Sequence, residues 1–391
     1  MNEKNVSYGI APSKIRELFE YGKKRKKEIG EDNVFDFSIG NPSSPVPIEV
    51  TNALTKLIQE NQSLVHSYTS AIGDPLARKS IKEYIENTYQ VQADENLIYL
   101  TCGAAAGLAI TFNAILNEGD EAIVFAPYFP EYKVFINHAK GKIVEVKPSE
   151  DLLPDLSDLE AKINQKTAFV LYNSPNNPTG VLYKEEIIKD ICRILERKQS
   201  EYHHPIYLIS DEPYRELIYD DVKYPFIFKY YKNSIVTYSY SKSLSIPGER
   251  IGYIAVNPLM QNAQKLYYAI AGAGRSLGYI SAPSLFQHLI PYINGIYADL
   301  KYYQNNRDYL YKMLKNIGYD VVYPDGAFYL FMKALEEDAS KFSDIAKEYE
   351  LLLVPSNSFG LDGYVRISYS VSLKTIKDSQ QAFEKLYHRY K

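Results

Sequence analysis

Seven short apolar runs, each the length of a buried strand, alternate with helical patterns along the middle of the chain. The runs cover residues 96–101, 121–125, 142–146, 167–172, 205–210, 234–240 and 253–256, and helical patterns such as 103–117 and 184–198 lie between several of them. Strands that alternate with helices predict a largely parallel sheet covered on both faces. We therefore expect an α/β fold with one large, mostly parallel, seven-stranded sheet.

The pattern changes after about residue 285. A long helical region, 284–317, is followed by shorter strand-like and helical segments, which predicts a smaller α+β domain. An amphipathic helix expected at 13–29 precedes the large domain and is expected to pack with this C-terminal unit. The predicted organisation is an N-terminal arm over residues 1–45, a large domain over 46–284 and a small domain over 285–391.

Composition excludes several classes of protein. The net charge of −4 disfavours a binder of nucleic acid that depends on phosphate attraction. No apolar stretch reaches the roughly 20 residues that span a bilayer, and no secretory signal is visible at the start. The two cysteines, Cys102 and Cys192, form no CxxC motif, so neither a disulfide framework nor a zinc site is expected. We expect a soluble cytoplasmic protein without nucleic-acid, membrane or metal partners.

Ligands of open α/β sheets bind outside the carboxyl ends of the strands, and chemically useful residues follow the predicted strands. Gly103, Ala104 and Ala105 open a helix after the first strand, where free backbone N–H groups can hold a phosphate. Phe129 follows the second strand and can stack on a planar ligand. Asn177 follows the fourth strand and can donate to an oxygen.

The next two strands end in charged residues that are poorly solvated there. Asp211 closes one apolar strand and needs a partner, either an arginine or the protonated ring nitrogen of a cofactor. Lys242 follows the next strand, where desolvation favours the neutral amine that forms a Schiff base. Arg250, eight residues later, can clamp a phosphate. Each feature has a structural alternative, but together they match the requirements of pyridoxal phosphate.

At this point the chain resembles the fold-type I, class I/II pyridoxal-phosphate aminotransferases, the aspartate aminotransferase superfamily. The resemblance spans about residues 13–390. It is carried, in order, by FSIGNPSSPVP (37–47), YTSAIG (68–73), TCGAAAGL (101–108), PYFPEY (127–132), NSPNNPTG (173–180), DEPY (211–214), SYSKSLSIPGERIGY (239–253), PDGAFYLF (324–331) and VRIS (365–368).

The resemblance implies a role for each matching residue. Lys242 matches the Schiff-base lysine, which later moves the proton between the substrate Cα and the cofactor. Asp211 matches the carboxylate that pairs with the pyridine N–H, and Tyr214 and Asn177 match the donors to the phenolic oxygen of the cofactor. Further matches are the stacking ring (Phe129), the backbone phosphate donors (Ala104 and Ala105) and the side-chain phosphate ligands (Ser239, Ser241 and Arg250).

The remaining matches concern the partner subunit and the substrate. Tyr68 matches a tyrosine that reaches the phosphate in the neighbouring subunit, which implies a homodimer with shared active sites. Gly40 and Arg366 match the site that holds the substrate α-carboxylate. Arg275 either reads a distal carboxylate of aspartate or glutamate, from the partner subunit, or is a structural or interface residue, and both interpretations stay open.

The resemblance therefore implies an aminotransferase that moves an amino group between an L-amino acid and a 2-oxo acid such as 2-oxoglutarate. The donor is expected to be aspartate-like or aromatic. The alternative is a carbon–sulfur β-lyase on the same fold, although NNPTG favours transamination. A third interpretation, a cofactor-binding regulator, usually requires a DNA-binding module, for which the roughly dozen residues before the first predicted helix leave little room.

Overall fold

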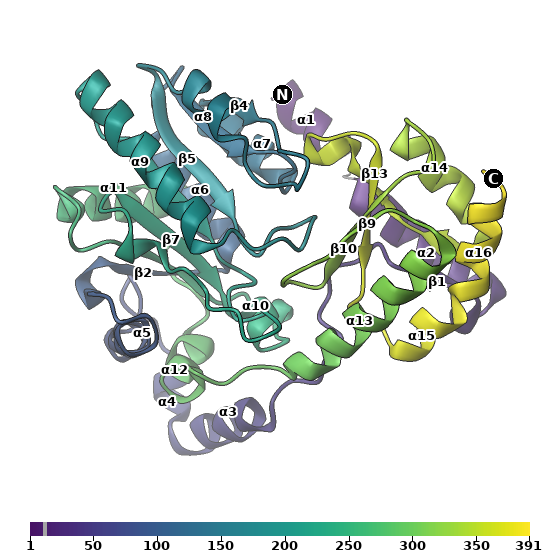
Figure 1. Cartoon of the computed structure of the whole chain (residues 1–391). Helices are drawn as coiled ribbons and strands as arrows, with labels where there is room; N and C mark the ends of the chain where they lie inside the picture. The colour runs from purple at the N-terminus through teal and green to yellow at the C-terminus, as the bar shows by residue number, and fades with distance from the viewer. Residues whose placement is uncertain (11–13) are drawn as a thin grey trace.

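A seven-stranded sheet forms the centre of the larger part of the molecule (Figure 1). The computed structural model describes residues 1–10 and 14–391. All seven predicted strands are confirmed, in the spatial order β2-β8-β7-β6-β5-β3-β4, with β8 antiparallel to both its neighbours and the others parallel. The strands are β2 (Ile98–Thr101), β3 (Glu121–Phe125), β4 (Lys142–Val146), β5 (Thr167–Asn173), β6 (Tyr207–Asp211), β7 (Ser234–Ser239) and β8 (Gly252–Val256).

Helices cover both faces of this sheet, as the near-continuous apolar strands require. Ile123 and Phe125 of β3 pack on one face and Ala122 and Val124 on the other, because successive side chains of a strand alternate. Helices α5, α9 and α12 pack on the first face, and α6, α7 and α11 on the second. The helices here are α3 (Ile48–Glu60), α4 (Gln62–Val65), α5 (Pro75–Tyr89), α6 (Ala104–Ile115), α7 (Glu131–His138), α8 (Leu156–Lys162), α9 (Glu185–Tyr202), α10 (Tyr240–Ser243), α11 (Ala263–Ser276) and α12 (Ser284–Ile293).

A second, smaller unit lies beside the large sheet, at the right of Figure 1. Its four-stranded antiparallel sheet has the order β12-β13-β10-β9 and packs against helices through a separate apolar core. The elements are α13 (Leu300–Ile317), β9 (Val321–Val322), β10 (Tyr329–Lys333), α14 (Ala339–Ala346), β11 (Leu351–Leu352), β12 (Val354–Pro355), β13 (Tyr364–Ser368), α15 (Leu373–Asp378) and α16 (Gln380–His388).

The N-terminal segment lies against this smaller unit. Strand β1 (Phe35–Asp36) pairs in parallel with β11, and Leu18 of α2 (Lys14–Ile29) packs against Val354 and Phe359. A further helix, α1 (Glu3–Ile10), precedes α2. Of the helix predicted at 13–29, residue 13 lies outside the described residues. The domain boundaries at 45 and 284 stay a prediction.

One part of the helical region expected near the C-terminal unit is not helical. The helical region predicted at 284–317 is two helices, α12 and α13, separated by residues 294–299. Gly295 adopts φ +83°, which a right-handed helix does not allow, and the Asp299 side chain accepts hydrogen bonds from the backbone N–H groups of Lys301 and Tyr302. A glycine in the left-handed region followed by a capping aspartate ends one helix and starts the next.

Candidate active site

A cavity of about 280 Å³ lies outside the carboxyl ends of β5, β6 and β7, between the two units. It collects every predicted site residue except Tyr68 and Arg275. The predicted residues that line it are Gly40, Ala104, Ala105, Phe129, Asn177, Asp211, Tyr214, Ser239, Ser241, Lys242, Arg250 and Arg366. Parallel strands present their carboxyl ends at one edge of the sheet, which brings together residues more than a hundred positions apart.

Lys242 lies on α10, the short helix that follows β7. Its Nζ donates to the backbone carbonyl of Gly40, 2.6 Å away. Burial, followed by the nearby positive charges of Arg366 and Arg250, lowers the pKa of Lys242 to about 8. An amine with this pKa is partly neutral near pH 7 to 8, which is the form that attacks a carbonyl carbon.

Asp211 ends β6 and faces the same cavity. Its Oδ2 accepts a hydrogen bond from the hydroxyl of Tyr132, whereas its Oδ1 is buried and has no partner among the described residues. Burial raises the pKa of Asp211 to about 7. A buried carboxylate oxygen that lacks a donor fits a protonated ring nitrogen placed in the cavity.

The start of α6 and Arg250 lie together at another wall of the cavity. Gly103, with φ +81°, precedes α6, and a Cβ there would lie only 2.7 Å from a nitrogen of Arg250. Arg250 donates to the carbonyls of Pro247 and Cys102 at 3.0 and 3.2 Å, and to the Ser241 hydroxyl at 3.4 Å. Helix N-termini and an arginine together hold phosphate well, so these residues fit the phosphate of the predicted cofactor.

Arg366, on β13 of the smaller unit, faces the cavity from the opposite side. It is only 2% exposed, and it donates to the Asn177 side chain at 3.0 Å and to the Ser38 carbonyl at 2.6 Å. Its Nε has no hydrogen-bond partner among the described residues, and both acceptors of its other nitrogens are neutral oxygens. Burial lowers the pKa of this guanidinium from its ordinary value. A buried guanidinium whose acceptors are neutral can bind a carboxylate through two parallel hydrogen bonds, as a bidentate pair.

Tyr68 and Arg275 do not line the cavity of their own chain. Tyr68 is fully exposed in the loop after α4, and Arg275 is exposed in the last turn of α11. The role predicted for Tyr68 at the neighbouring subunit's site stays a prediction, and both interpretations of Arg275 stay open.

Sequence reasoning assigned no role to two tyrosines that the structure places among the predicted residues. Tyr132 donates to Asp211, and Tyr329 lines the cavity with its hydroxyl 3.0 Å from that of Tyr214. Both lie in the quoted motifs PYFPEY and PDGAFYLF. A tyrosine in an otherwise apolar motif near the end of a strand could have indicated a role at the site. The same pattern is also typical of a tyrosine packed in a hydrophobic core.

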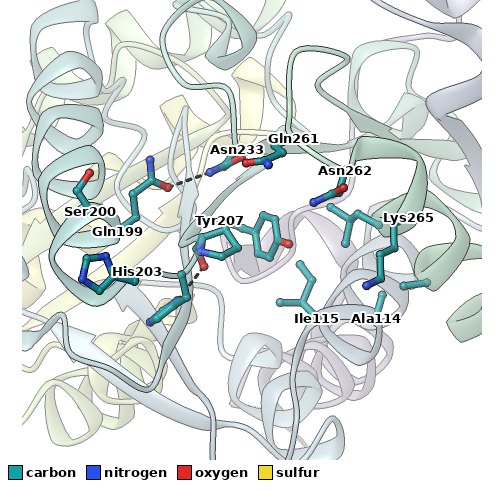
Figure 2. A pocket seen from close by; sticks show the side chains of 14 residues that line it. Ala114, Ile115, Gln199, Ser200, His203, Tyr207, Asn233, Gln261, Asn262 and Lys265 are labelled. Atoms are coloured by element: carbon teal, nitrogen blue, oxygen red, sulfur yellow. Dashed lines mark hydrogen bonds between the residues drawn. The ribbon is translucent and has the colours of Figure 1, made fainter.

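A different cavity, of about 560 Å³, lies at the opposite edge of the sheet (Figure 2). It is bordered by Tyr207 at the start of β6, by Asn233 before β7 and by Lys265 of α11. The Asn233 amide donates to Gln199 at 2.9 Å within it. None of the predicted site residues lines this cavity. Among the described residues, no helix is long and apolar enough to cross a membrane, and no group of three or more His, Cys, Asp or Glu is arranged to hold a metal ion.

Comparison with known proteins matches nearly the whole chain to one family. The family described as aminotransferase class I and II matches residues 32–383. The aspartate aminotransferase of Pyrococcus horikoshii is 31% identical over 96% of this chain and 95% of its own. The crystal structure of an aminotransferase from Eubacterium rectale is 49% identical with a TM-score of 0.97, covering 100% and 99% of the two chains. The aspartate aminotransferase of Thermotoga maritima is 28% identical with a TM-score of 0.85, covering 96% and 97%.

Proposed function

The chain belongs to the aminotransferase class I and II family and is a transaminase, and on this basis we propose the cofactor and substrates that it uses. The proposed cofactor is pyridoxal 5′-phosphate. The proposed reaction moves an amino group between an L-amino acid, aspartate-like or aromatic, and a 2-oxo acid such as 2-oxoglutarate. The observation that carries the proposal is the pair formed by Lys242, an amine of lowered pKa, and Asp211, a carboxylate with an unpartnered oxygen in the same cavity.

The residues around the cavity fit each part of this cofactor. Asp211 Oδ1 would accept from the ring nitrogen, and Phe129 would stack on the ring. The N–H groups of Ala104 and Ala105, with Arg250 and the serine hydroxyls of residues 239 and 241, would hold the phosphate. When bound, the cofactor supplies an electron-withdrawing ring that accepts the electron pair of the substrate Cα–H bond.

Lys242 would do the proton transfer. Its amine is the group that would hold the cofactor at the aldehyde carbon. With its pKa lowered to about 8, Lys242 Nζ would also take up and return the proton of the substrate Cα. A pKa near the working pH lets one group act as both base and acid.

Arg366 would orient the substrate. Two parallel hydrogen bonds from its guanidinium would fix the α-carboxylate and hence the bond at Cα that lies across the ring. Asn177 already accepts from Arg366 at 3.0 Å, so it would adjoin the substrate carboxylate as well as the cofactor oxygen. Tyr214, buried beside it, would donate to that same phenolic oxygen.

Several features support a homodimer with shared sites. Leu64, Tyr68, Tyr279 and Ile280 are exposed apolar side chains. The Thr69 hydroxyl lies 2.9 Å from that of Ser281, so the two segments that carry these side chains are neighbours on one face. An apolar face of this kind suits a second copy of the chain. Light scattering of the purified protein tests the dimer, and Tyr68→Ala should weaken binding of the cofactor while the dimer persists.

The names of the relatives favour transamination over the carbon–sulfur β-lyase alternative. They leave the amino donor open, and aspartate is the first candidate because aspartate aminotransferases are among the relatives. The cytoplasmic location and the absence of nucleic-acid partners stay predictions from the sequence.

Absorbance spectroscopy tests the proposal. The purified protein with pyridoxal phosphate should show a visible band that one L-amino acid removes and 2-oxoglutarate restores. Lys242→Ala should lose the band, and Arg25→Lys, at a surface ion pair with Glu350, serves as the unaffected control. Release of pyruvate and ammonia from cysteine-like substrates would support the lyase instead, and absence of a band in the wild type would refute the cofactor assignment.

A further inference from the structure

Tyr329 is a buried residue of β10 to which the proposed function assigns no role. It belongs to the segment PDGAFYLF, lines the cavity and is 2% exposed. Its side chain comes from the smaller unit, as does that of Arg366, whereas Tyr214 follows β6 of the large sheet. Tyr329 is therefore placed where the two units meet across the site.

The hydroxyl of Tyr329 lies 3.0 Å from the hydroxyl of Tyr214, and the two rings meet edge to face with centroids 5.7 Å apart. Each phenol has one proton to donate. If Tyr214 gives its proton to the phenolic oxygen of the cofactor, the hydrogen bond between the two hydroxyls must run from Tyr329 to Tyr214. Tyr329 then fixes Tyr214 as a donor toward the cavity.

The ring of Tyr329 contacts Arg366, the residue proposed to hold the substrate carboxylate. The guanidinium carbon lies 4.4 Å from the ring centroid, within the range of a cation–π contact. The same tyrosine thus touches one residue that would face the substrate and one that would face the cofactor.

Gly40 shows how closely this hydroxyl is confined. A Cβ added at residue 40 would lie 1.9 Å from the Tyr329 hydroxyl oxygen, so any larger side chain must displace the phenol. The carbonyl of Gly40 accepts from Lys242, so the backbone here is held in place from the other side as well.

We propose that Tyr329 is a positioning residue that joins carboxylate binding at Arg366 to the hydrogen bond that Tyr214 donates to the cofactor, an inference that rests on the proposed function. A donated hydrogen bond polarises the phenol that receives it and makes that phenol a stronger donor in turn. The ring face holds the guanidinium by a contact that does not need the hydroxyl. The two halves of the role can therefore be separated by substitution.

The test compares Tyr329→Phe with Tyr329→Leu in protein loaded with pyridoxal phosphate. A donor to the phenolic oxygen favours its ionised form, so weakening Tyr214 should move the pH midpoint of the visible spectrum upward. In Tyr329→Phe this upward shift should be about 0.5 to 1 pH unit, the size expected for one neutral hydrogen bond. Acetate, used as a bare carboxylate probe, should bind Tyr329→Phe within about twofold of the wild type, and Tyr329→Leu about three- to tenfold more weakly.

A double variant decides whether Tyr329 acts through Tyr214. In a Tyr214→Phe background, Tyr329→Phe should cause no further shift of the spectral midpoint. Gly40→Ala, which displaces the phenol by another route, should reproduce the upward shift of Tyr329→Phe. Tyr364→Phe is the matched control, because its ring stacks on Phe331 at the same sheet away from the cavity, and its midpoint should not move.

The outcomes separate this inference from the proposed function. An additive double variant, or a Tyr329→Phe midpoint equal to that of the wild type, would overturn the role of Tyr329 while the wild-type band upholds the cofactor assignment. A wild type without a pyridoxal phosphate band would instead overturn the proposed function and this inference with it. Thermal unfolding of each variant without cofactor identifies any shift that arises from loss of the fold.

Discussion

Two buried arginines, Arg215 and Arg366, occupy opposite electrostatic situations. Each is 2% exposed. Arg215 donates to the carboxylates of Glu212 at 2.8 Å and Glu216 at 3.1 Å, and to the Tyr253 hydroxyl at 3.0 Å. Within the described part of the chain, Arg366 donates only to neutral oxygens, and its Nε has no partner there. Neighbouring carboxylates neutralise the charge of Arg215 inside the fold, whereas the observed acceptors of Arg366 are neutral and leave its charge uncompensated.

The difference in pKa follows the same division. Burial acts to lower the pKa of Arg215, but the hydroxyls of Tyr253 and Tyr89 and the carboxylates of Glu216 and Glu212 raise it, whereas burial lowers the pKa of Arg366. The rings around Arg215, with that of Tyr238 centred 4.1 Å away, enclose it fully. Removing one partner of a buried ion pair leaves the other charge uncompensated in the fold, whereas a buried charge without a counter-charge is available to a ligand. This contrast leads to four predictions.

The largest expected effect is the loss of stability when Arg215 is substituted. Arg215→Leu leaves Glu212 buried without its partner and should lower the free energy of unfolding by about 3–5 kcal/mol. Arg366→Leu removes an unpaired buried charge, so it should lower that free energy by no more than about 1 kcal/mol. Urea unfolding of both variants without cofactor measures the difference. Equal losses at the two positions would contradict the contrast between them.

The second prediction concerns catalysis at Arg366. Arg366→Lys keeps the charge but loses the planar, two-pronged donor, and kcat/KM should fall about 10²-fold. The larger part should appear in KM, because the carboxylate contact already forms with the bound substrate. Steady-state kinetics with the best amino donor measure it, with Arg25→Lys as the surface control. An unchanged KM would show that the α-carboxylate binds elsewhere.

The strands and the polar residues that end them could be predicted from the order of residues in the sequence, whereas the composition alone indicates neither. The seven strands were predictable because their apolar runs end abruptly in polar residues, and those polar residues are the ones that meet in the cavity. The antiparallel direction of β8 was not predicted, since it depends on how the short connection over residues 240–251 turns back. The break at residues 294–299 was missed because Gly295 and Asp299 act through backbone conformation and capping.

Tyr132 and Tyr329 escaped prediction for a different reason. The chain has 37 tyrosines, so a tyrosine in an apolar segment carries little information by itself. Only the packing of separate elements decides whether its hydroxyl reaches another polar atom. Tyr132 contacts Asp211 from α7 and Tyr329 contacts Tyr214 from β10, and neither pair is close in sequence.

The third prediction applies the contrast to Asp211, whose Oδ1 meets no hydrogen-bond donor in residues 1–10 and 14–391. Burial raises its pKa from 3.8 to about 7, so the native carboxyl keeps its proton to a higher pH than the unfolded chain does. Stability without cofactor should therefore fall as the pH rises from about 4 to about 7. Asp211→Asn cannot lose a proton, so the free energy of unfolding of this variant should rise by about 3 kcal/mol relative to the wild type over that pH range.

Bound cofactor supplies the counter-charge, so it should reverse the difference between wild type and Asp211→Asn. Urea unfolding at pH 4 to 7, with and without pyridoxal phosphate, follows both effects. A difference between the two proteins that stays constant with pH would show that Asp211 is ionised throughout and already has a partner.

The smallest effect expected is at Lys242, and it is kinetic. The lysine pKa is lowered from 10.5 to about 8, so the neutral fraction of its amine should rise about tenfold between pH 6 and pH 7 and level off above pH 8. The rate at which the protein captures added pyridoxal phosphate should follow this curve in stopped-flow absorbance. A free lysine derivative under the same conditions controls for ionisation of the cofactor, and its rate should keep rising toward pH 10.5. If the two curves coincide, burial beside Arg366 and Arg250 does not lower the pKa of the Lys242 amine. The uncompensated charge of Arg366 then does not act on Lys242 across the cavity.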